Sequence, residues 1–198
     1  MSKNLKWILI FLGVGLLTCP FWILGLAMLI GKLDSGYTKK DLIENYIEKT
    51  KEIDKLKIYI NSVVPTDKSV EIEFDGDSEL AIFHVYAHGE WDNNWNLNIN
   101  STKTDSLLQK IGWTKDILKV IKKKLDNANC ISVSDGEPCE IGFQRSGMGK
   151  YYYNIFSKPM SDSIRKLYND SCIYIPYNDR VVLEYGSGAI GSLCFPDK

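Results

Sequence analysis

Two histidines lie close together in the sequence, near carboxylates of the kind that metal sites and acid–base catalysts use. His84 and His88 are the only histidines of the chain, and Glu90 and Asp92 follow them. The apolar and aromatic neighbours of His84 favour a strand, in which four residues separate two α-carbons by about 13 Å. Two ligands of one zinc ion cannot lie so far apart without a sharp turn. We therefore expect sheet or surface histidines and no metal; acid–base catalysis with the nearby carboxylates is the alternative.

Two other motifs have the spacing of ligand-binding loops. The segment from Gly186 to Gly191 matches the G-x-G-x-x-G pattern of dinucleotide sites, but only seven residues follow it. These leave no room for the helix and the second strand that such a site requires. Asp75, Asp77 and Glu79 alternate as calcium ligands do, yet the glycine and the final glutamate of a calcium loop are missing. We expect neither a cofactor nor a metal ion at these positions.

Four cysteines form an even set in the C-terminal four-fifths of the chain: Cys130, Cys139, Cys172 and Cys194. An even set is typical of two disulfide bonds in an oxidising compartment. The first two cysteines bracket Asp135 to Pro138, a turn signal that would bring them close. Each bridge between sequence neighbours would contribute roughly 3 kcal/mol by loop closure. The alternative is four reduced thiols packed in the core of a cytosolic domain.

The C-terminal half is rich in aromatic residues, among them Tyr151, Tyr152 and Tyr153. Consecutive residues of a strand point to opposite faces, so at least one of the three should be exposed. An exposed aromatic patch would suit a glycan, peptide or protein partner, whereas packing within the sheet is the alternative. These tyrosines, with His84 and His88, are the candidate ligand-binding residues.

Composition and charge narrow the class of protein. The net charge is −1, the isoelectric point is near 6.1, and 44% of the residues are hydrophobic. These values fit a globular domain with its own core and disfavour a nucleic-acid partner, which usually requires a concentrated basic surface. The one dense basic run, Lys119 to Lys124, falls in a helical pattern and is interpreted as the solvated face of a helix.

The strongest signal is an uncharged segment of 24 residues, Trp7 to Ile30. At about 1.5 Å per residue this length crosses a hydrocarbon core of about 30 Å. It exceeds the apolar region of a cleavable signal peptide, and Cys19 offers a lipoprotein-type anchor as the alternative. We expect a basic N-terminus over 1–6, a transmembrane helix over 7–30, a linker over 31–37 and a single soluble domain over 38–198. Lysines flank the span on both sides, so its orientation depends on the cysteines, which favour an extracytoplasmic domain.

Hydrophobic periodicity predicts the elements of the soluble domain. A helix over 38–64 begins with a capping box of Thr38 and Asp41 and ends at Pro65. Its apolar stripe packs on its own domain, or else forms a coiled-coil stalk between protomers of a homo-oligomer. Three alternating strands follow, then a helical stretch over 102–126 that Gly112 breaks, and further strands interrupted by a short helix capped by Ser161. This order predicts an α+β fold with a mostly antiparallel sheet and two or three helices.

Three interpretations are consistent with these observations. The first is a membrane-anchored, extracytoplasmic domain without enzymatic activity that binds a partner or supports an envelope assembly. The second is a membrane-anchored enzyme in which His84, His88 and nearby carboxylates converge. A cytosol-facing membrane protein with free thiols is the third interpretation.

Overall fold

The structure is a computed structural model that describes residues 36–146, 149–169, 172–187 and 191–195. The predicted transmembrane segment over 7–30, with Cys19 and the basic N-terminus, lies outside these residues. Among the helices that are described, none is both long and apolar enough to span a bilayer. The residues from Tyr37 onward form one compact unit.

The first described helix, α2 (Lys39–Val63), starts at the predicted capping box. The Thr38 hydroxyl accepts a hydrogen bond from the Asp41 backbone amide, while the Asp41 carboxylate accepts one from the Thr38 backbone amide at 2.8 Å. These reciprocal bonds satisfy two of the amide groups that a helix start leaves unpaired. The helix ends at Val63, shortly before Pro65, which cannot continue it.

The described strands form one antiparallel sheet in the order β3-β2-β1-β4-β5-β6-β8-β7, with β9 paired to β8. Most neighbours in the sheet are also neighbours in the chain, which is typical of hairpin connections. The strands are β1 (Ser69–Asp75), β2 (Glu79–Ala87), β3 (Glu90–Asn98), β4 (Ser132–Ser134), β5 (Cys139–Ser146), β6 (Gly149–Ile155), β7 (Tyr174–Pro176), β8 (Val181–Ser187) and β9 (Gly191–Ser192).

Three more helices are described: α3 (Thr102–Ile111), α4 (Lys115–Ala128) and α5 (Asp162–Leu167). Gly112 separates α3 from α4 because it adopts a left-handed backbone conformation with φ of 72°, which glycine reaches without steric penalty. The predicted break is therefore confirmed. Ser161 caps α5 through a bond from the Ile164 amide to its hydroxyl, also as expected.

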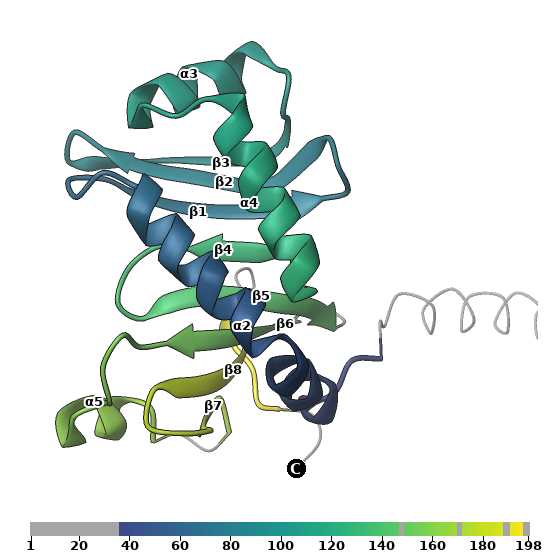
Figure 1. The fold of residues 1–198 in the computed structure, drawn as a ribbon, viewed down its shortest axis with the longest axis vertical. Coiled ribbons are helices and arrows are strands. Elements are labelled where there is room, and N and C mark those ends of the chain that lie inside the picture. The colour runs from purple at the N-terminus through teal and green to yellow at the C-terminus, as the bar shows by residue number, and fades with distance from the viewer. Residues whose placement is uncertain (1–35, 147–148, 170–171, 188–190, 196–198) are drawn as a thin grey trace, which may run out of the picture. The chain divides into compact units, whose positions relative to one another are not determined.

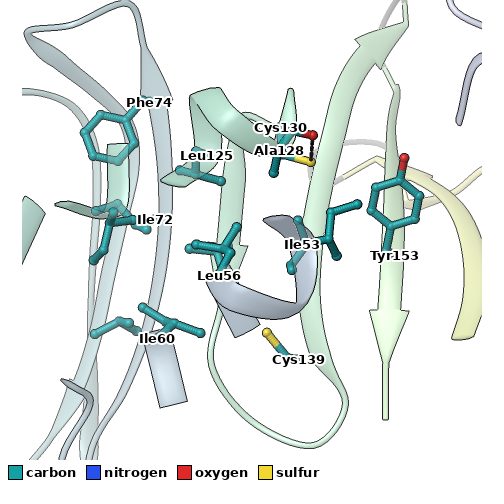
Figure 2. Packing of buried hydrophobic residues seen from close by; sticks show 14 of the residues in the cluster. Ile53, Leu56, Ile60, Ile72, Phe74, Leu125, Ala128, Cys130, Cys139 and Tyr153 are labelled. Carbon is teal, nitrogen blue, oxygen red and sulfur yellow. Dashed lines mark hydrogen bonds between the residues drawn. The ribbon is translucent and has the colours of Figure 1, made fainter. Parts of the chain in front are cut away.

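Helices α2 and α4 pack against each other on one face of the sheet (Figure 1). Figure 2 shows Leu56 and Ile60 of α2 among Ile72, Phe74 and Leu125, contributed by β1 and α4. These side chains belong to one continuous buried cluster that runs from β2 to β8. The α+β class and the mostly antiparallel sheet are thus confirmed, with four described helices where two or three were expected.

Candidate functional site

The sheet carries a second, largely polar face opposite α2 and α4. Antiparallel partners in neighbouring strands share a face, and residues that alternate with the core positions Ile72 and Phe83 must point away from the helices. The pairing register aligns such residues in rows across the strands from β3 to β8. We call this surface the open face; its rows are Asn93, His84, Glu71, Ser134, Glu140 and Asn154, then Trp95, Ile82, Glu73, Ser132, Gly142, Tyr152 and Glu184, with Trp91, Tyr86 and Lys150 beside them.

A buried ion pair lies in the middle of the open face. Lys150 Nζ is 2.8 Å from Glu73 Oε2 and 3.0 Å from Ser132 Oγ, and the side chains of Lys150 and Glu73 are each 3% exposed. Arg145 binds the other oxygen of the Glu73 carboxylate at 2.6 Å. Glu73 is therefore held between two cations, which compensates the loss of water around its charge.

Gly142 makes this ion pair sterically possible. The Lys150 side chain passes over β5 to reach Ser132 and Glu73 on the strands beyond it. A β-carbon at Gly142 would lie 2.0 Å from Ser132 Oγ and 3.1 Å from Lys150 Cδ. Because atoms cannot approach that closely, only glycine leaves the space that the lysine side chain occupies.

Carboxylates gather around the ion pair. Part of the Glu140 side chain is exposed, but the surrounding protein still removes enough water from its carboxyl group to raise the pKa of Glu140. The charges of Glu184 and Glu71 raise this pKa further. Desolvation also raises the pKa of Glu184, opposed by the hydrogen bond that Asn154 donates at 2.7 Å. Burial is the main cause of the raised pKa of Tyr152. The charges of the nearby glutamates raise it further: Glu71, Glu73, Glu184 and Glu140. The open face thus concentrates negative charge around a half-buried phenol.

The β8 end of the open face is covered by a small apolar cluster. Val182 is fully buried there beneath Phe156 and Met160, and Ile164 and Tyr168 from the α5 region pack against them. Burial raises the pKa of Tyr168 to about 12, with further contributions from Glu140, Tyr174 and Glu184. Tyr168 therefore stands at the boundary between the covered end and the carboxylates.

Aromatic residues occupy the other end of the open face, on β2 and β3. Trp91 is 51% exposed and Trp95 is 58% exposed. The Trp95 ring meets His84 edge to face with centroids 4.9 Å apart, and Trp91 lies 5.5 Å from Tyr86. Two large apolar side chains this exposed on one strand are unusual for a surface without a partner.

His84 is the predicted site residue that lies next to a carboxylate on the open face. Its Nδ1 lies 3.2 Å from Glu71 Oε2, and its buried Nε2 has no hydrogen-bond partner among the described residues. His88, by contrast, is exposed in the turn after β2, where its φ is 57°. The described residues contain no cluster of His, Cys, Asp or Glu that could hold a metal ion.

The three consecutive tyrosines divide between the two faces as their alternation predicts. Tyr151 and Tyr153 are fully buried on the helix side, where their hydroxyls donate to the backbone oxygens of Tyr37 at 3.0 Å and Leu42 at 2.8 Å. A surface patch of Tyr151 and Tyr153 is therefore excluded, because both rings fill the core. Of the three, only Tyr152 points to the open face. Its ring is half-buried and is contacted by the ammonium group of Lys150.

The four cysteines within the described residues form one bridge. Cys172 and Cys194 are joined in a disulfide, whereas Cys130 and Cys139 are free and buried. The expected turn between them exists, but the hairpin pairs Ser132 with Gly142 and Ser134 with Glu140. This register directs Cys130 toward the level of Gln144, about 16 Å along the strand from Cys139. Figure 2 shows the two sulfur atoms well apart, with Cys130 donating to Ala128 O at 3.3 Å.

Comparison of the chain with protein-family models, curated proteins and solved structures finds no match. The chemistry of the open face must therefore be interpreted from its own residues. Sequence analysis identified His84 and Tyr152 but missed the tryptophans as a site and the pairing of Glu73 with Lys150. The alternation of Glu71 and Glu73 with apolar residues was the available signal, because it marked one polar face of β1.

Proposed function

We propose that the chain is a membrane-tethered, extracytoplasmic binding domain without enzymatic activity, and that its open face binds a glycan of the cell envelope. The observation that carries this proposal is the exposure of Trp91 and Trp95 on the same face of β3, with polar groups around them. Indole rings offer flat apolar surfaces against which the apolar faces of sugar rings can stack. The amide of the exposed Asn93 and the carboxylate of Glu71, whose side chain is 35% exposed beside His84, supply hydrogen-bonding groups near these rings.

The tether is the uncharged segment from Trp7 to Ile30. Its length favours a membrane-spanning helix, and the Cys172–Cys194 disulfide favours an oxidising compartment. Membrane fractionation of cells that produce the full chain tests this part of the proposal. We expect the protein to resist extraction by alkaline carbonate, whereas full-length protein released without detergent would contradict a transmembrane tether.

Glycan binding is tested with the full chain in detergent against a panel of envelope polysaccharides and their fragments. Alanine at both Trp91 and Trp95 should remove binding, because the stacking surface is lost. Leu167→Ala is the matched control, since Leu167 is 76% exposed but lies on α5, outside the tryptophan end. Equal binding by the double variant and the wild type would refute the tryptophan site, whereas capture of a protein in place of a glycan would refute the ligand class.

The rival function is an anchored enzyme, and the pair of His84 and Glu71 favours it. A carboxylate at Nδ1 orients the histidine ring. The Nε2 atom has no hydrogen-bond partner among the described residues but is buried, so proton exchange with a substrate requires the neighbouring side chains to move. This interpretation requires chemical change of the bound glycan. Product analysis after long incubation separates the two functions: an unchanged glycan supports binding alone, and cleavage that His84→Gln abolishes supports catalysis.

A further inference from the structure

A cavity of about 510 Å³ lies between α2 and the segments that follow β6 and precede β8. It is separate from the open face, because α2 packs on the opposite side of the sheet. Four charged side chains line it: Asp54 and Lys57 from α2, and Asp179 and Arg180 from the β7–β8 connection. Its volume falls within the range of about 300–1,000 Å³ that is common for small-molecule sites.

Lys57 forms the buried part of the cavity wall. The residue is only 8% exposed, and its Nζ donates one hydrogen bond, to the backbone oxygen of Ile155 at 2.8 Å. No carboxylate of the described residues lies within 4.0 Å of this ammonium group. An ammonium group has three donors, and a buried cation is unfavourable without an anion or further acceptors. The position of Lys57 therefore favours a negatively charged group inside the cavity.

The mouth of the cavity carries both signs of charge. Asp54, Asp179 and Arg180 are exposed, and none of the three forms an ion pair with another or with Lys57 in the described part of the chain. Burial raises the pKa of Tyr46, Asp54 raises it further, and Arg180 opposes the change. Both charges therefore act on the same phenol, so a bound molecule at the cavity mouth would meet a carboxylate and a guanidinium together.

We propose that this cavity binds a small zwitterion of the α-amino acid class, with its carboxylate at Lys57 and Arg180 and its ammonium group at Asp54 and Asp179. The apolar rim residue Ile58 and the ring of Tyr46 are available to contact the ligand side chain. This site is distinct from the glycan site proposed for the open face, because none of Trp91, Trp95 and Asn93 lines the cavity.

The test is a thermal-shift and calorimetric titration of the full chain in detergent with the standard L-amino acids. Acetate and alaninamide are the matched probes, since each carries only one of the two charges. We expect saturable binding of at least one amino acid and weaker binding of both single-charge probes. Absence of saturable binding by every amino acid, or equal binding of acetate or alaninamide, would overturn the proposal.

Variants assign the binding to this cavity. Lys57→Met keeps the length of the side chain and removes its charge, and should weaken binding by about tenfold or more, as expected for a lost charged hydrogen bond. Arg180→Met provides a second test on an exposed loop, where folding is less at risk. Lys55→Met is the control, because Lys55 is an exposed neighbour on α2 outside this cavity. Undiminished binding by both Lys57→Met and Arg180→Met would overturn the assignment.

Discussion

Lys150 Nζ lies 2.8 Å from Glu73 Oε2, and both side chains are almost wholly buried on the open face. The two residues are 77 positions apart in the sequence, so the whole order of strands from β1 to β6 is needed to bring them together. The pair therefore connects the two halves of the sheet across β4 and β5.

Replacing Glu73 with Gln should lower the free energy of unfolding by about 3–5 kcal/mol, because Lys150 would be left as a buried cation without an anion. Urea denaturation of the full chain in detergent measures this change. Glu71→Gln is the matched control on the same strand, since the Glu71 side chain is 35% exposed. A loss for Glu73→Gln no larger than that of the control would show that the buried pair contributes little.

Gly142→Ala should destabilise the fold by about 1–3 kcal/mol, as is typical of overpacking. The added carbon would meet Ser132 Oγ at 2.0 Å. Because that oxygen is the closest obstacle, the double variant Ser132→Ala/Gly142→Ala should lose less than the sum of the two single variants. A double-mutant cycle by chemical denaturation measures the coupling, and strict additivity would contradict the proposed steric role of Gly142.

Glu140→Gln should stabilise the protein near pH 7 and have little effect below pH 4. The folded state raises the pKa of Glu140 above its ordinary value of 4.5. A carboxyl group with a raised pKa in the folded state stabilises that state while it is protonated at low pH. This contribution is lost as the pH rises through the folded-state pKa. Thermal unfolding of wild type and variant at both pH values checks this, with Glu90→Gln as the exposed control. An equal effect of Glu140→Gln at the two pH values would contradict the raised pKa.

Non-reducing peptide mapping of Cys130, Cys139, Cys172 and Cys194 in protein from its native host should find a Cys172–Cys194 disulfide and free thiols at Cys130 and Cys139. Burial raises the pKa of the Cys139 thiol to about 12 and also raises that of Cys130. Both thiols should therefore react with maleimide only after unfolding, since the thiolate is the reactive form. A Cys130–Cys139 bridge would show that the hairpin register differs from the one described, and free thiols at all four of these positions would remove the argument for an oxidising compartment.

Local signals in the sequence predicted most elements of the fold. The capping box at Thr38, the stop at Pro65 and the left-handed Gly112 each depend on a few adjacent residues, and each lies where it was expected. The alternation of β1 likewise separated Glu71 and Glu73 from the core residues between them. Such features are predictable because neighbours in the chain alone decide them.

The open face could not be assembled from the sequence, because it depends on pairing between distant strands. The turn before Cys139 was predicted, but no local signal specified the register of the hairpin. The observed register keeps Cys130 away from Cys139. In the same way, the sequence around Lys150 gives no sign that this lysine is buried. Its burial depends on the pairing of β6 with β5, which places Gly142 beneath its side chain. One pairing choice decides all of these neighbours, since a shift of one residue exchanges the two faces.

Cysteine labelling at Asn93 in intact cells of the native host tests the central claim most directly. Asn93 is exposed on the open face between Trp91 and Trp95, and Leu167→Cys on α5 provides the reference rate. The account predicts that a membrane-impermeant maleimide reaches both Asn93→Cys and Leu167→Cys from outside, and that in cells Asn93→Cys reacts more slowly relative to Leu167→Cys than it does in purified protein. Labelling of either cysteine only after lysis, or the same relative rate in cells and in purified protein, would contradict a tethered domain that binds an envelope partner through this face.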